Sequence, residues 1–225
     1  MACGEPIFRV VFWWLAFLVL TIAGEWLELN RLIRQTPLVR WEFFVAGATV
    51  LGGVAAATWW PEPGVRAMGV GLIALTLWLA RHDVARRTVR QRGLTRFMAV
   101  SLLGGYAWLG VGGAIAAATG AAMPGVLYDA LLHAVFVGFV MSMVFAHAPI
   151  IFPAVLGVPL PYRQSFYLHI GVLHLSLIVR VVGDLVDVLG RWRGWGGLLN
   201  TVALLLFMVN TGRSMALGGM RGESI

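Results

Sequence analysis

The chain has 225 residues, of which 60% are hydrophobic and only 12% are charged, and its mean hydropathy is +0.84. Since about a quarter of the residues in a soluble domain are charged, this composition predicts an integral membrane protein. All 17 basic residues are arginine. A retinal Schiff base and a phosphate-binding P-loop both need lysine, so neither is expected. The arginines lie in short loops between apolar runs, where they set topology, so the net charge of +7 does not indicate nucleic acid as a partner.

Seven apolar segments follow one another along the chain, and each is close to the roughly 20 residues that a membrane-spanning helix needs. Their approximate bounds are 7–27, 41–60, 64–81, 96–119, 126–149, 163–187 and 195–216. The first lacks a small-residue cleavage site, so we interpret it as a span and not as a signal peptide. The pattern predicts an all-α polytopic bundle that forms one transmembrane domain over residues 1–225. We expect residues 1–119 to be scaffold and the helix pair in 126–187 to carry the chemistry, with 195–216 as the last span.

Arginines are concentrated between the third and fourth spans, and this cluster consists of Arg81, Arg86, Arg87, Arg90, Arg92 and Arg96. Positive loops stay in the cytoplasm, so we expect the N-terminus outside and the C-terminus inside. The cluster is also a candidate surface for anionic lipid or an acidic partner. Arg191 and Arg193 fall on the outer side in this scheme, where Asp184 and Asp187 offset them.

Four of the five histidines lie in two neighbouring spans: His133 and His147 in the fifth, and His169 and His174 in the sixth. Ionisable side chains are costly inside a bilayer, so they are candidates for function. A bound cofactor would explain four clustered imidazoles. Hydrogen bonds between neighbouring helices are the alternative explanation for them.

The spacing of the histidines favours haem. His133 and His147 are fourteen residues apart, close to four α-helical turns, so both should project from one face about 21 Å apart. Helix bundles that hold two stacked haems use such pairs. We expect His133 and His174 to be the axial pair of a b-type haem. His147 and His169 form a second pair, for another haem or a metal such as copper. Asp129 lies one turn before His133, where it either orients the imidazole or belongs to the outer interface.

The sixth span is predicted to have one polar face, which carries His169, Ser176, Arg180, Asp184 and Asp187, whereas His174 points away from it. Arg180 is a candidate clamp for a haem propionate or part of a proton path. The alternative is that Arg180 and Asp184 neutralise each other against a neighbouring helix. The proline-rich segment 148–161 is expected to be an apolar loop that caps the inner site.

The pattern His133-Ala134-x-x-x-Gly138-x-x-x-x-Met143 resembles the histidine helix of the NnrS family, and the helix that follows is similar at Leu177, Arg180 and Val181. NnrS proteins are polytopic bacterial membrane proteins implicated in the response to nitric oxide, and they carry haem and copper. The resemblance thus implies a location in the bacterial inner membrane. The family's Gly-His-Thr-Gly-Arg segment is replaced here by APIIFPAVLGVPLPYRQ. The resemblance therefore implies a role only for His133, as a haem ligand.

Together these features predict a membrane-embedded protein with one or two non-covalent b-type haems, with copper as a further candidate metal. It would transfer electrons between a quinol pool and a redox partner protein, or bind and process a small diatomic such as nitric oxide. No catalytic residue is assigned. One alternative is a subunit or anchor without chemistry of its own, which docks other membrane subunits. Another is a small transporter that uses the face of Arg180, Asp184 and Asp187.

Overall fold

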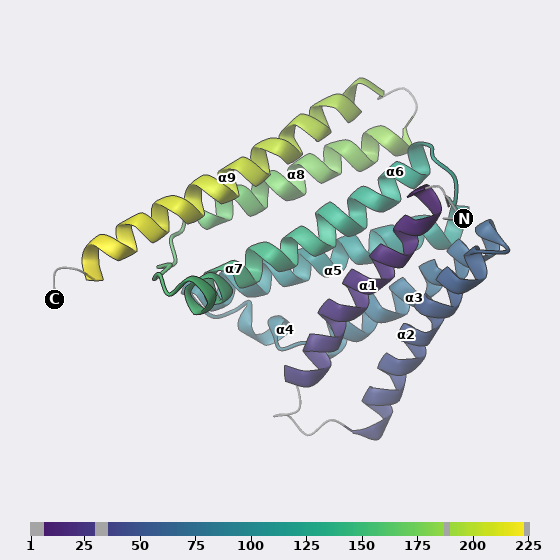
Figure 1. The fold of residues 1–225 in the computed structure, drawn as a ribbon, viewed down its shortest axis with the longest axis horizontal. Coiled ribbons are helices and arrows are strands. Elements are labelled where there is room, and N and C mark those ends of the chain that lie inside the picture. The colour runs from purple at the N-terminus through teal and green to yellow at the C-terminus, as the bar shows by residue number, and fades with distance from the viewer. Residues whose placement is uncertain (1–6, 30–35, 187–189, 223–225) are drawn as a thin grey trace, which may run out of the picture. The chain divides into compact units, whose positions relative to one another are not determined.

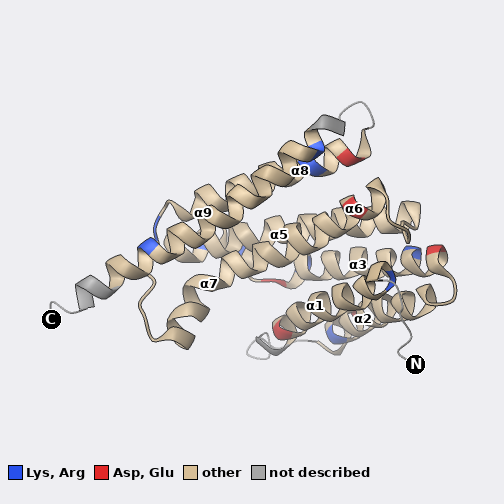
Figure 2. Ribbon diagram, turned by 45° about the horizontal axis from the view of Figure 1, so that its top comes forward, with Lys and Arg blue, Asp and Glu red and all other residues tan. Residues whose placement is uncertain are grey.

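The computed structural model describes residues 7–29, 36–186 and 190–222. This part of the chain is helical and contains no strand (Figure 1). Seven of its helices are long and apolar enough to cross a membrane. The protein is thus an all-α, multi-pass membrane helix bundle, as the sequence predicts. Figure 2 shows that charged residues are sparse along the spans, which suits segments that face lipid.

The helices follow the order α1 (Ile7–Leu29), α2 (Pro37–Ala57), α3 (Pro61–His82), α4 (Ala85–Thr88), α5 (Gly93–Thr119), α6 (Val126–Leu132), η2 (His133–Val140), α7 (Met141–Leu156), α8 (Phe166–Leu185) and α9 (Gly190–Gly222). Helices α2 and α3 each begin on a proline, a few residues before the predicted start of the span. Proline is well suited to the first turn because the N–H that it lacks has no helical partner there.

The fifth span is longer than predicted. Elements α6, η2 and α7 together make a continuous helical segment from Val126 to Leu156. The predicted loop from residue 148 is wrong in its first half, because α7 continues through Pro149 and Pro153. In an apolar span the helix still satisfies most backbone groups, so it tolerates the bonds that proline removes. Helix α7 ends before Gly157, whose φ of +67° is the left-handed conformation that commonly terminates helices.

The chain forms two compact units. Unit 1 contains residues 1–83 and 106–140, and unit 2 contains residues 84–105 and 141–225. Unit 1 therefore holds His133, whereas unit 2 holds His147, His169 and His174. Helix α5 contributes its second half to unit 1 and its first half to unit 2.

Close helix packing in unit 1 depends on small residues. A Cβ atom at Gly53 of α2 would lie 2.2 Å from the backbone nitrogen of Met68 in α3. One at Gly69 of α3 would lie 2.4 Å from the backbone nitrogen of Ala117 in α5. Only glycine lets these backbones approach so closely, which is the usual basis of helix association in membranes.

Unit 2 is built around the pairing of α8 and α9. A Cβ atom at Gly196 of α9 would lie 2.7 Å from the Cα atom of Arg180, and one at Gly218 would lie 2.7 Å from the carbonyl oxygen of Pro159. The hydroxyl of Ser214 donates to the carbonyl oxygen of Pro161. Helix α9 is therefore held along α8 at one end and against the α7–α8 connection at the other.

Candidate functional site

His133 is placed in unit 1 at the junction of α6 and η2, and its own helix orients the ring. Its Nδ1 atom lies 2.9 Å from the main-chain oxygen of Asp129 and 3.5 Å from the Asp129 carboxylate. A carbonyl oxygen can only accept, so Nδ1 carries the proton and Nε2 keeps its lone pair. This arrangement orients histidines that bind metals. Asp129 therefore contacts the imidazole of His133, and the contact through its main-chain oxygen is shorter than the one through its carboxylate.

The helix changes type at His133. Residues His133–Val140 form a π-helix, in which each backbone bond spans five residues instead of four. The predicted shared face of His133 and His147 assumed α-helical turns throughout. With a π-helical segment between them, fourteen residues no longer correspond to four turns, so the spacing does not argue for a shared face. π-Helical segments are rare and are often found at functional sites.

His147 lies in α7 and has the same local arrangement as His133. Its Nδ1 atom is 2.8 Å from the main-chain oxygen of Met143, one turn earlier. Nδ1 therefore donates, and the lone pair of Nε2 is available to a metal. The side chain is half-buried.

His169 is the most buried of the four histidines, with 1% of its surface exposed. Four phenylalanine rings surround it, with centroid distances of 5.9 Å for Phe97, 4.9 Å for Phe145, 5.6 Å for Phe166 and 5.4 Å for Phe207. The side-chain amide of Asn210 lies 3.4 Å from Nδ1 and donates to it, which assigns the ring proton to Nε2. A protonated nitrogen inside a cage of carbon atoms does not suit a metal. The helix-to-helix hydrogen bond considered from the sequence describes His169 better.

His174 points away from His169, as predicted, and faces α5 instead of α9. A Cβ atom at Gly104 would lie 2.5 Å from Nε2 of His174 and 2.7 Å from its Cε1 atom. The imidazole therefore fills the space that the glycine leaves on α5. Nε2 is directed at the α5 backbone, and a porphyrin at this nitrogen would require α5 to move away.

Arg180 and Asp184 are part of a buried ionic group that joins α8 to α9. The Asp184 side chain has no exposed surface; its carboxylate lies 2.6 Å from Nε of Arg193 and 3.4 Å from Nε of Arg180. Arg180 also donates through Nη1 to the main-chain oxygen of Arg193, at 2.9 Å. The guanidinium of Arg180 therefore contacts α9. Arg180 and Asp184 form the ion pair against a neighbouring helix that was considered as the alternative to a propionate clamp. Asp187 lies outside the described residues.

The described part of the predicted polar face, from His169 to Asp184, packs against α9. Ser176 contacts the side-chain oxygen of Asn200, and both residues are buried. From one end of α8 to the other, the α8–α9 seam consists of His169 with Asn210, Ser176 with Asn200, and Asp184 with Arg193. These three polar residues of α8 each have a counterpart on α9, as polar contacts across membrane helices favour.

A buried pair in unit 1 was not identified from the sequence. The hydroxyl of Tyr106 in α5 donates to the carboxylate of Asp83, which follows α3 directly, and both side chains are buried. Asp83 lies within the arginine-rich segment, where the pattern favoured a solvated loop. The one sequence signal was that Asp83 is the sole acidic residue between Arg81 and Arg96.

Within the described ranges, no group of three or more His, Cys, Asp or Glu side chains is arranged to hold a metal ion. A haem needs only one or two protein ligands, so the haem hypothesis depends on single imidazoles such as His133.

Residues 1–215 match the model of a family described as a domain of unknown function, DUF8744. The chain belongs to that family. Comparisons with curated proteins and with solved structures gave no match.

Proposed function

We propose that this chain is a membrane-embedded b-type haem protein in which Nε2 of His133 binds the haem iron. One observation supports this more than any other: Nδ1 of His133 is bonded to the main-chain oxygen of Asp129 at 2.9 Å, which leaves Nε2 able to coordinate. The side chain of His133 is 25% exposed, so it is not enclosed by the packing of unit 1. The resemblance of this helix to the NnrS histidine helix points to the same residue.

His133 would be the one protein ligand of the haem iron. His174 was expected to be the second, but the place of its ring against Gly104 favours a packing role. A five-coordinate haem iron has an open position, where a small diatomic such as nitric oxide binds. Binding or processing of a diatomic is therefore favoured over electron transfer through a closed bis-histidine haem. Reducing equivalents for the iron would come from a quinol pool or a redox partner protein.

His147 is the candidate ligand for a second haem or a copper ion. Its Nδ1 atom is anchored on Met143 in the same way, at 2.8 Å. His169 and Arg180 are not part of this proposal, because the phenylalanine cage and the α8–α9 ion pairs engage them. The role of the protein at either site is to fix the imidazole tautomer and ring direction.

The alternative functions both depended on the polar face of the sixth span. A transport path or a docking site for a partner helix needs that face to be accessible. In unit 2 the described part of this face is covered by α9, where Asp184 is ion-paired with Arg193 and Ser176 is hydrogen-bonded to Asn200. This coverage by α9 argues against a transport path or a docking site on this face, and so favours the haem protein.

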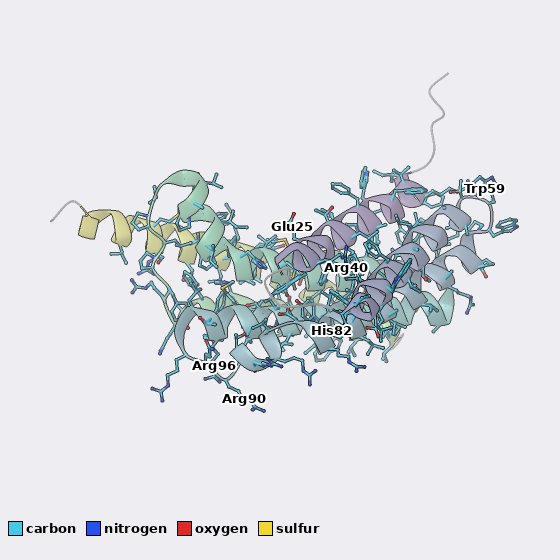
Figure 3. All side chains as sticks on the ribbon, turned by 90° about the horizontal axis from the view of Figure 1, so that it is seen from below. Glu25, Arg40, Trp59, His82, Arg90 and Arg96 are labelled. Atoms are coloured by element: carbon cyan, nitrogen blue, oxygen red, sulfur yellow. The ribbon has the colours of Figure 1, made fainter. Side chains whose placement is uncertain are left out.

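We further propose that the protein lies in the bacterial inner membrane with its N-terminus outside. The arginines that support this orientation are exposed: Arg81, Arg86, Arg87, Arg90, Arg92 and Arg96. Figure 3 shows Arg90 and Arg96 extending away from the helices. Such a group retains a loop in the cytoplasm.

An optical spectrum of the purified protein, with a haem and metal count per chain, tests the proposal. We expect a Soret band that shifts on reduction with dithionite and again on addition of nitric oxide. His133→Ala should lose at least about 90% of the haem bound at this site, since removal of an axial ligand removes the main bond to iron, whereas a haem held by His147 should remain. His174→Ala and His82→Ala, as matched histidine controls, should retain it. A folded, colourless wild-type protein would refute the proposal.

A further inference from the structure

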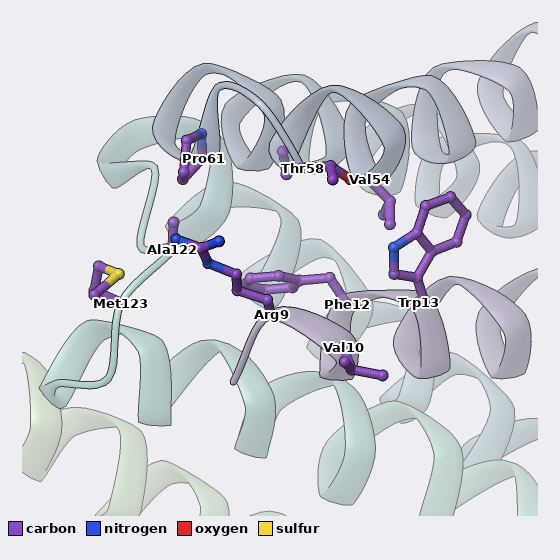
Figure 4. Close-up of a pocket in the computed structure, with 10 residues that line it drawn as sticks. Arg9, Val10, Phe12, Trp13, Val54, Thr58, Pro61, Ala122 and Met123 are labelled. Carbon is purple, nitrogen blue, oxygen red and sulfur yellow. The ribbon is translucent and has the colours of Figure 1, made fainter. Parts of the chain in front are cut away.

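Unit 1 contains a cavity of about 130 Å³ that the haem proposal does not use (Figure 4). It lies between the first turns of α1, the end of α2, the start of α3 and the segment after α5. The residues that line it are Arg9, Val10, Phe12, Trp13, Val54, Ala57, Thr58, Pro61, Ala122 and Met123.

The lining combines one permanent positive charge with apolar walls. Among the described residues around the cavity, Arg9 is the only charged one. Figure 4 shows its side chain extending toward Pro61 and Ala122, across the space beneath Thr58. Phe12 and Val54, which form the walls, are 3% and 2% exposed, so helix packing fixes their positions. A ligand that fits must therefore carry both an anionic group and an apolar part.

The neighbouring arginine, Arg66, does not line the cavity. Nη1 of Arg66 lies 2.6 Å from the main-chain oxygen of Ala118, and its Nη2 lies 3.3 Å from that of Thr119. It thus caps the C-terminus of α5, where the helix dipole favours a cation. Any anion in the cavity would be recognised by Arg9.

The cavity lies where a bilayer meets water. Arg9 is in the first turn of α1, and Thr58 and Pro61 lie in the connection between α2 and α3. Four tryptophans on these same ends are exposed: Trp13, Trp14, Trp59 and Trp60, at 46%, 51%, 71% and 65%. Exposed tryptophans at helix ends mark the headgroup level of the membrane, where lipid phosphates lie.

We propose that this cavity binds the headgroup region of an anionic phospholipid. The planar guanidinium of Arg9 matches phosphate oxygens with two parallel N–H donors. Thr58 supplies a hydroxyl donor, and Phe12, Val54 and Met123 contact the glycerol and the first methylenes of the acyl chains. The apolar walls distinguish this ligand from free phosphate, which gains nothing from them.

Native mass spectrometry of the full chain in detergent tests the site, with phosphatidylglycerol, phosphatidylcholine and inorganic phosphate as separate probes. We expect one tightly retained phosphatidylglycerol per chain. Arg9→Gln should weaken it by about tenfold or more, since a charged donor pair is lost. Arg213→Gln removes the same charge from an exposed position of unit 2, outside the arginine cluster, and should leave affinity unchanged. Thr58→Phe, which fills the cavity, should also release the lipid while Arg9 remains.

Three results would overturn the proposal. The first is equal retention of phosphatidylglycerol by the wild type and Arg9→Gln, with both monodisperse on gel filtration. The second is binding of phosphatidylcholine as tightly as phosphatidylglycerol. The third is binding of inorganic phosphate with similar affinity, which would indicate a simple anion site. None of these depends on haem content, so this test and the haem test can fail independently.

Discussion

The contact between Gly104 and His174 gives the most direct test of how unit 2 is assembled. Addition of a methyl group by Gly104→Ala places a Cβ atom 2.5 Å from Nε2 of His174, where ordinary contact begins at 3.4 Å. The overlap is therefore about 0.9 Å, and either the imidazole or α5 must move. Overpacking of this kind costs about 1–3 kcal/mol, and we expect Gly104→Ala to destabilise the protein by about 2 kcal/mol.

A double-mutant cycle with His174→Ala tests whether the imidazole of His174 causes this loss of stability. His174→Ala removes the ring and should cost about 1–2 kcal/mol through lost contacts. In the double mutant the alanine at 104 has room, so the combined loss should fall short of the sum by at least about 1 kcal/mol. The assay is the free energy of unfolding in detergent titrated with SDS, followed by circular dichroism. Strict additivity would refute the inference that His174 is held by this glycine.

Stability should also depend on Gly53 in unit 1 and on Asp184 in unit 2. Gly53→Ala should destabilise unit 1 by about 3 kcal/mol, because its Cβ meets backbone atoms at 2.2 Å. The control is Gly52→Ala, because a Cβ atom at Gly52 would have nothing within 4 Å. It should leave stability unchanged or raise it by about 0.5 kcal/mol. If both variants lost the same free energy of unfolding in SDS, the close contact of α2 with α3 would be contradicted. Asp184→Ala should cost about 3 kcal/mol, the lower end for breaking a buried ion pair, because Arg193 is 36% exposed. Glu62→Ala, on an exposed surface, is the control, and equal thermal stability of the two variants would show that the ion pair contributes nothing.

The positions and number of the spans could be predicted because they depend on local properties. Each apolar run is long enough to cross a bilayer, and each break contains proline, glycine or arginine. The main error was the end of the fifth span, where Pro149 and Pro153 suggested a loop. A proline removes one backbone hydrogen bond. The remaining backbone N–H and C=O groups in an apolar span still need hydrogen-bond partners, and a helix supplies them.

The candidate site was less predictable. Helical periodicity correctly separated His169 from His174 and grouped Ser176, Arg180 and Asp184 on one face, because it fixes direction about a helix axis. It did not show which neighbour each face meets. Phe166 lies one turn before His169 on the same helix, but the other three phenylalanine rings come from α5, α7 and α9, and no spacing along α8 could reveal them.

The sequence by itself thus determined a membrane protein with seven apolar spans and a polar face on the sixth of them, α8. The tertiary structure alone decided that α9 covers this face, that Gly104 receives the ring of His174, and that a π-helix begins at His133. The physical reason is that composition and periodicity describe each helix relative to its own axis and the bilayer. The environment of an imidazole instead depends on side chains distant in the sequence, which only packing brings together.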